Sequence, residues 1–272
     1  MSHTPPPLLV ETRGDVDWVT LNRPARLNSL DNDLTRDLRE YFEALYRRRD
    51  CRIVVLRGAG RAFCAGLDLH SEQADRFANG SMPDAMDVQR NIRDIMLAMR
   101  RCPQPIVCLM HGAAAGGGFV LAMAADIRIA AENCTMNAAF IKIGLGGCDV
   151  GASYLLPRLI GSSPAASILF TGQDLSAERA YQLGLVSELV AVEKLEEVAQ
   201  TYVDAMQATA PEALRMTKQV FTLNIDAPSF EAALALEDRN QVLLGKEPAF
   251  HEGVAAFYEK RPPRFDQARP AS

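Results

Sequence analysis

The sequence predicts an α/β fold whose last third is almost entirely helical. Two short apolar runs, 53–57 and 105–110, have the length of buried strands, and each leads into a loop of small residues. Between them, segment 87–101 spaces its apolar residues as a helix does. Strand, helix and strand in this order indicate a parallel pair joined by a right-handed crossover.

The N-terminal residues predict a strand pair followed by a helix. Segments 7–13 and 15–22 are strand candidates around a turn at Gly14, with Trp18 in the core. After a loop over 23–28, the pattern of segment 31–50 predicts an amphipathic helix, with these apolar residues inward: Leu34, Leu38, Phe42 and Leu45.

The middle of the chain is less regular. Segment 70–83 is polar and predicts a mobile lid, with Glu72 and its charged neighbours on a solvated face. Segment 126–131 predicts a third buried strand. After a glycine bend, Asp149 stands at the start of a helix candidate that runs to Ile160, either as its N-cap or facing a pocket. Later helix candidates begin at Ser163, Ser176, Glu193, Pro211, Ser229 and Phe250.

Length and composition limit the class of protein. The 272 residues, 48% of them hydrophobic, suffice for one large domain or a domain with an appendage. A net charge of −5 argues against a general nucleic-acid or acidic-membrane binder. The sequence has no secretory signal or membrane-length apolar run. Six scattered cysteines indicate a reduced, cytoplasmic protein. The four histidines lie far apart in the sequence, which argues against a metal site.

The glycine triplet 116–118 is the first candidate site. At a helix start it lets the backbone approach a ligand closely and leaves N–H groups without partners at the positive end of the helix dipole. Both small-residue loops leave the same edge of the predicted sheet, so two backbone donors could converge on one oxygen. The alternative is a glycine turn needed only for packing.

Other chemical motifs are weaker. The pair Gly58 and Gly60 hints at a dinucleotide-binding turn, but Phe63 stands where the third glycine belongs. The sequence contains neither a P-loop nor a Gly-x-Ser-x-Gly elbow. Cys64 and Cys148 lack a histidine motif to activate them, so we expect them to be inert.

Taken together, the motifs resemble the crotonase, or enoyl-CoA hydratase/isomerase, superfamily over almost the whole chain. The matching segments are Leu21-Asn-Arg-Pro24, Asn28-Ser-Leu30, 60–69, 111–118, Ala125-Asp-Ile-Arg128, 156–161 and 252–261. The resemblance implies a spiral of ββα units over 1–205 that binds acyl-CoA. It also implies a helical region, 206–272, that packs subunits into trimers, often paired into hexamers. Coenzyme A would enter only as part of the substrate.

The resemblance also implies site residues. The backbone N–H groups of Leu67 and Gly117 match the family's oxyanion hole, which stabilises negative charge on a thioester oxygen. Coenzyme A contacts are implied for Arg26, Leu27, Ala65, Asp68, Gly116 and Lys260.

Two departures from the family bear on the reaction. Hydratases place glutamates where this sequence has Val120 and, in our alignment, Phe140. Neither side chain can move a proton, so the usual hydratase mechanism is in doubt. Asp149 is the remaining candidate, and we expect it to act as the proton shuttle of a double-bond isomerase. The alternatives are a hydratase with another carboxylate such as Glu72, a thioester hydrolase with Asp149 as nucleophile, and a non-catalytic acyl-CoA scaffold.

Overall fold

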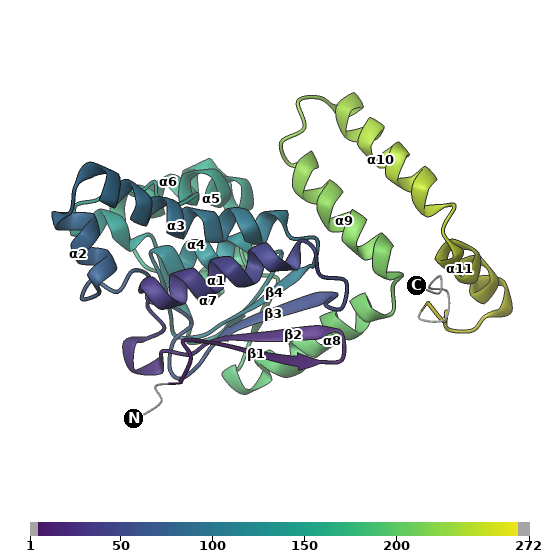
Figure 1. Cartoon of the computed structure of the whole chain (residues 1–272), viewed down its shortest axis with the longest axis horizontal. Coiled ribbons are helices and arrows are strands. Elements are labelled where there is room, and N and C mark those ends of the chain that lie inside the picture. The colour runs from purple at the N-terminus through teal and green to yellow at the C-terminus, as the bar shows by residue number, and fades with distance from the viewer. Residues whose placement is uncertain (1–4, 266–272) are drawn as a thin grey trace.

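A six-stranded sheet forms the centre of the protein (Figure 1), whose computed structural model describes residues 5–265. Strands β1 and β2 pair antiparallel, as predicted, and every later neighbour in this sheet is parallel. The order across the sheet is β1 (Leu8–Arg13), β2 (Val16–Leu21), β3 (Ile53–Gly58), β4 (Ile106–Met110), β6 (Ile127–Ala131) and β9 (Glu188–Val190).

A second, smaller sheet lies beside the first. It contains β5 (Ala113–Ala115), β7 (Thr135–Asn137) and β8 (Leu175–Ser176), in that order. From β4 to β7 the chain gives strands alternately to the two sheets, β4 and β6 to the large one and β5 and β7 to the small one. The path is therefore a spiral, and the α/β prediction is confirmed.

Alternating side chains of the central strands enter two separate cores. Trp18 and Val55 point to the face covered by α8 (Leu195–Gln207), while Val19 and Leu56 point to the opposite face. The helices on that opposite face are α1 (Asn32–Leu45), α3 (Met82–Arg101) and α4 (Gly117–Ala124). Every residue of α4 is buried, so the glycine turn that begins this helix is held firmly inside the molecule.

The segment that the sequence predicts to be a mobile lid, residues 70–83, is helical, and its mobility remains a prediction. The segment forms α2 (Glu72–Asn79) and the first turn of α3. Ser71 caps α2 by accepting a hydrogen bond from the Ala74 amide, and Ser81 begins a capping box that starts α3. The few apolar residues of this segment hide its helical period, while the capping serines fix where the helices start.

The remaining helices confirm the helical last third. They are α5 (Ala152–Ile160), α6 (Ser162–Thr171), α7 (Ala177–Gln182), α9 (Pro211–Asn224), α10 (Phe230–Leu244) and α11 (Pro248–Glu259). Short 3-10 turns cover Pro24–Arg26, Ala139–Ile143 and Val192–Lys194. None of the helices within residues 5–265 is both long and apolar enough to cross a membrane.

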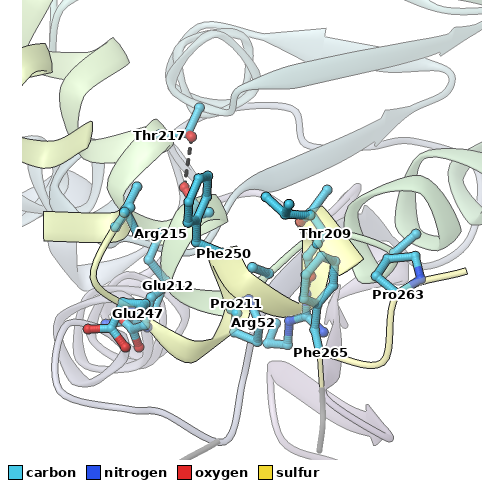
Figure 2. A pocket seen from close by; sticks show the side chains of 18 of the residues that line it. Arg52, Thr209, Pro211, Glu212, Arg215, Thr217, Glu247, Phe250, Pro263 and Phe265 are labelled. Carbon is cyan, nitrogen blue, oxygen red and sulfur yellow. Dashed lines mark hydrogen bonds and ion pairs between the residues drawn. The ribbon is translucent and has the colours of Figure 1, made fainter. Parts of the chain in front are cut away.

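Helices α10 and α11 stand away from the sheet (Figure 1). No residue of α10 is buried. A hollow of about 1150 Å³ separates these helices from the edge of the core. Figure 2 shows Arg52 and Arg215 from the core side of this hollow and Phe250 and Phe265 from the C-terminal side. The predicted boundary at 205/206 falls near the end of α8, and it remains a prediction.

Candidate active site

Two loops that follow central strands are joined at one edge of the sheet. The loop after β3 pairs with the chain around β5: the amide of Cys64 donates to the Ala113 carbonyl at 3.0 Å, and the amide of Ala115 donates back to the Cys64 carbonyl at 2.9 Å. These hydrogen bonds place the segment 65–67 beside the glycine turn that starts α4. The two-loop arrangement expected from the sequence is present.

Gly66 allows the two loops to come this close. A Cβ on Gly66 would lie 2.7 Å from the Ala115 oxygen and 3.3 Å from the Gly117 nitrogen, and the residue has a φ of +87°. Gly118 likewise packs directly against the Cys64 carbonyl, with no room for a side chain. The amides of residues 67 and 117 therefore belong to backbone segments in direct contact.

The amides of Leu67 and Gly117 have no hydrogen-bond acceptor among residues 5–265. Their neighbours are fixed, because the Leu30 amide donates to the Gly66 carbonyl at 2.7 Å and the Asp68 amide donates to the Leu30 carbonyl at 2.9 Å. Gly117 also opens α4, where the helix dipole favours negative charge. Two donors held ready in this way suit an oxygen that gains negative charge during a reaction.

Leu67 and Gly117 line one cavity of about 120 Å³. Its side-chain walls are apolar apart from Gln89 and Asp149. The apolar side chains are Leu30, Leu67, Leu69, Phe77, Val88, Ile92, Phe140, Ile143, Leu145 and Val150. Among the residues that line the cavity, Asp149 is the only one with an ionisable side chain.

Asp149 is not the N-cap of the following helix. Helix α5 begins at Ala152 with Gly151 as its N-cap, so this part of the sequence reading is wrong. One carboxylate oxygen of Asp149, Oδ1, instead accepts hydrogen bonds from the Gln89 side chain and, at 2.8 Å, from the Val150 amide. Val150 has a φ of +38°, a strained conformation for a β-branched residue. The turn thus aims the carboxylate at the cavity rather than along the helix axis.

The positions aligned with the two hydratase glutamates carry no acid. Val120 is fully buried inside α4, and Phe140 presents its ring to the cavity beside Gly116. Glu72 is exposed on α2 and does not line the cavity. No group of three His, Cys, Asp or Glu side chains that could hold a metal occurs in the described part of the chain.

The residues predicted to contact coenzyme A fall into two places. Ala65 lines the cavity, and Leu27 lies beside it, since the Ala65 amide donates to the Leu27 carbonyl at 3.0 Å. Arg26 is exposed on the same loop. Lys260 follows α11, at the far end of the molecule from α2 (Figure 1), so it does not approach the cavity of its own chain.

Asp68 has a structural partner. Its carboxylate pairs with Arg23 at 2.9 Å, and Arg23 also pairs with Asp31 at 2.9 Å. Burial is the strongest single influence and acts to raise the pKa of Asp68. The hydrogen bonds from Arg23 and the His70 amide, together with the charges of Arg23 and Arg26, outweigh it and hold the pKa below its usual value. The side chain therefore ties the 23–31 segment to the loop, and the backbone amide of Asp68 is already paired with the Leu30 carbonyl.

Sequence and structure comparisons place this architecture in a known group. The family model described as enoyl-CoA hydratase/isomerase matches residues 11–268. The chain belongs to the enoyl-CoA hydratase/isomerase family. It is 38% identical over 261 residues to a "probable enoyl-CoA hydratase" of Mycobacterium tuberculosis, covering 95% of this chain and 92% of the relative. It is 36% identical to the 1,2-epoxyphenylacetyl-CoA isomerase of Escherichia coli, covering 95% and 97% of the two chains.

Solved structures of the family agree with the fold. An enoyl-CoA hydratase from Mycobacterium smegmatis superposes with a TM-score of 0.89 at 32% identity, covering 96% of this chain and 99% of that one. This enoyl-CoA hydratase/isomerase family member therefore has the crotonase fold, and it is an enzyme of a family that acts on coenzyme A thioesters.

The sequence reading missed Gln89. It lies next to Val88 and one turn before Ile92, beside the inward stripe of α3, and its side chain lines the cavity. A polar residue at an inward position of an amphipathic helix is a signal that sequence inspection can find.

Proposed function

We propose that this enzyme moves a carbon–carbon double bond in an acyl-CoA thioester. The Leu67 and Gly117 amides would hold the thioester oxygen, and Asp149 would carry the proton. The observation that supports this reaction is one apolar cavity with two unpaired backbone donors and a single carboxylate.

One carboxylate is sufficient for the whole reaction. Asp149 takes a proton from C2 of a 3-enoyl thioester, and the electron pair of the broken C–H bond moves through C1 onto the carbonyl oxygen. The resulting dienolate is stabilised by the two amides, each of which contributes about 3–4 kcal/mol in comparable sites. Asp149 then returns the proton to C4, and the double bond lies between C2 and C3.

Hydration fits the cavity less well. It needs water activated at one carbon and a proton delivered to the other, and two positioned carboxylates usually share this work. Val120 and Phe140 stand at the two expected positions and cannot do so. The isomerase of Escherichia coli among the relatives is compatible with our proposal, whereas the hydratase names of other relatives favour the alternative.

The acyl group is proposed to be uncharged and apolar. The cavity wall is made of aliphatic side chains and the rings of Phe77 and Phe140, which offer no partner to a second charge. The named substrate of the Escherichia coli relative is a phenylacetyl thioester whose ring carries an epoxide, so cyclic as well as open-chain acyl groups belong in the test.

Assays with 3-enoyl-CoA and 2-enoyl-CoA test the proposal directly. We expect the conjugated enoyl absorbance to appear from 3-enoyl-CoA, and we expect Asp149→Asn to lower turnover by ~10²–10⁴-fold. Rapid loss of that absorbance from 2-enoyl-CoA would show hydration instead. Release of free coenzyme A would indicate a hydrolase with Asp149 as nucleophile, and tight binding without turnover would indicate a scaffold.

We further propose that the C-terminal helices join copies of the chain into a trimer or a pair of trimers. Helix α11 exposes Phe257 and Tyr258 almost fully, at 78% and 79%, and α10 buries nothing. A second copy against this surface would cover it. It could also bring Lys260 to the coenzyme A of another subunit, a contact that the distance within one chain prevents. The remaining proposed contacts, at Arg26, Leu27, Ala65, Asp68 and Gly116, lie within one chain.

A further inference from the structure

Gln89 reaches the proposed proton carrier from a different helix. Its side-chain amide nitrogen, on α3, donates a hydrogen bond to Oδ1 of Asp149, 60 positions along the chain. Both side chains line the cavity and both are half-buried. Val88 and Ile92 are only 3% and 7% exposed and hold this face of α3 against the core. The backbone position from which the Gln89 side chain extends is therefore fixed.

The two oxygens of Asp149 are in different surroundings. Oδ1 accepts from Gln89 and from the Val150 amide. Oδ2 has no hydrogen-bond partner among residues 5–265. A carboxylate oxygen that already accepts two hydrogen bonds is the poorer base, and the free oxygen is the better one.

We propose that Gln89 is a positioning residue that holds Oδ1 in place, so that Oδ2 performs both proton transfers. This inference rests on the proposed isomerisation. The proton leaves C2 for Oδ2 while the C–H electron pair moves to the thioester oxygen. The same oxygen, unable to rotate away, then returns that proton to C4 on the same face of the dienolate.

Holding the carboxylate has a measurable consequence for the transferred proton. While the carboxylate is fixed, the proton on Oδ2 stays over the dienolate and a fraction of it returns before it exchanges with water. Without Gln89, rotation of the carboxyl group exposes this proton to solvent. The fraction returned to the substrate then falls even where the protein is fully folded.

The test uses Gln89→Met, which keeps the length of the side chain and removes the donor. Gln200→Met is the matched control, because Gln200 donates to Asp204 at 2.6 Å on an exposed face of α8, far from the cavity. The substrate is a 3-enoyl-CoA with deuterium at C2, and mass spectrometry measures deuterium at C4 of the product. Melting temperatures of all variants verify that they are folded.

We expect Gln89→Met to lower kcat by about 10- to 100-fold, the worth of one hydrogen bond to a charged group. KM should stay within about twofold, because the lost interaction orients a reacting group rather than binding the substrate. Deuterium at C4 should fall in Gln89→Met and remain unchanged in Gln200→Met. In an Asp149→Asn background, Gln89→Met should cause no further loss.

Three results would overturn the inference. Wild-type kcat and deuterium transfer in Gln89→Met, alongside an inactive Asp149→Asn, would refute the role of Gln89 and leave the proposed function standing. A further loss of kcat on adding Gln89→Met to Asp149→Asn would mean that Gln89 acts elsewhere. Normal turnover in Asp149→Asn itself would instead remove the proposed function, and the inference with it.

Discussion

At the scale of single residues, the absence of a side chain at Gly66 determines the geometry of the oxyanion site. The residue has a left-handed φ and lies where any side chain would meet the Ala115 carbonyl. The position of the neighbouring Leu67 amide depends on this contact. The oxyanion site is thus built from backbone atoms, and the residues that matter most are those with the least side chain.

Gly66→Ala should lower kcat/KM by ~10²–10³-fold, the usual effect of losing one donor of such a site, because the added methyl group would push the two amides apart. Steady-state kinetics with the best enoyl-CoA substrate measure this effect. Gly184→Ala is a matched control: its φ of +77° imposes the same backbone strain, but a Cβ there has nothing within 4 Å. Equal losses in the two variants would contradict the role of close approach.

The cysteines differ sharply in environment. Burial raises the pKa of Cys51, Cys64 and Cys134 to about 12, and it raises the pKa of Cys102 and Cys108 as well. Cys148, in the bend before Asp149, is exposed, so a reagent can reach it in the native protein.

Only one thiol should react rapidly with a disulfide reagent at pH 8 in the native protein. The thiolate is the reactive form, and at this pH a thiol whose pKa lies well above 8 is almost entirely protonated as well as shielded. All six should react after unfolding in guanidinium. Absorbance of the released reagent gives the count, and the fast phase should disappear in Cys148→Ser. A second fast thiol would show that the core opens on the time scale of the reaction.

At the scale of elements, polar contacts decide where α9 joins the core. Lys218, 5% exposed, reaches from α9 to the Gln104 carbonyl at 2.7 Å, the Met99 carbonyl at 3.1 Å and an oxygen of Asp126 at 2.8 Å. These acceptors lie near the end of α3 and in the segments just before β4 and β6. One lysine therefore fixes α9, the helix that precedes the C-terminal arm formed by α10 and α11.

Lys218→Met should lower the free energy of unfolding by about 3–5 kcal/mol, because the largely buried carboxylate of Asp126 loses the nearer of its two cations and keeps only Arg100, at 3.8 Å. Denaturant titration followed by the fluorescence of Trp18 measures the change. The control is Lys194→Met, which removes an exposed lysine paired with Glu197 and should cost about 0–1 kcal/mol. A similar small cost in both variants would mean that α9 is held mainly by its apolar face.

At the scale of the whole molecule, the C-terminal arm has little contact with its own core. Phe230, Phe257 and Tyr258 are among its exposed large side chains, at 74% to 79% exposure. A chain of this size rarely leaves so many rings in water. Helices α10 and α11 also border the large hollow, so assembly would change the surroundings of the hollow as well as of the exposed rings.

Light scattering after size exclusion should give three or six times the chain mass of 29.8 kDa. The double substitution Phe257→Glu with Tyr258→Glu should shift the protein toward a single chain, because charge at a buried contact opposes association. Glu237→Gln on α10 is the control: it changes a side chain of the same arm without adding charge, and we expect it to leave the oligomeric mass unchanged. A wild-type protein that stays monomeric at micromolar concentration would contradict the assembly.

Local sequence patterns determine most of the secondary structure of this protein. Strand-length apolar runs, the helical spacing of Leu34, Leu38 and Phe42, and the two small-residue loops determine the elements and their order. The family motifs add Leu67 and Gly117 as expected donors. These features depend on residues near one another in the chain, whose periodicity and turn chemistry are readable without a fold.

Tertiary structure alone decided the rest. The contact between Gln89 and Asp149 joins residues 60 positions apart, and no periodicity relates two side chains at that separation. The strained turn at Val150 moves Asp149 off the helix start. In each case packing of distant segments selects among local conformations that differ by only a few kcal/mol, so the sequence near the site leaves the choice open.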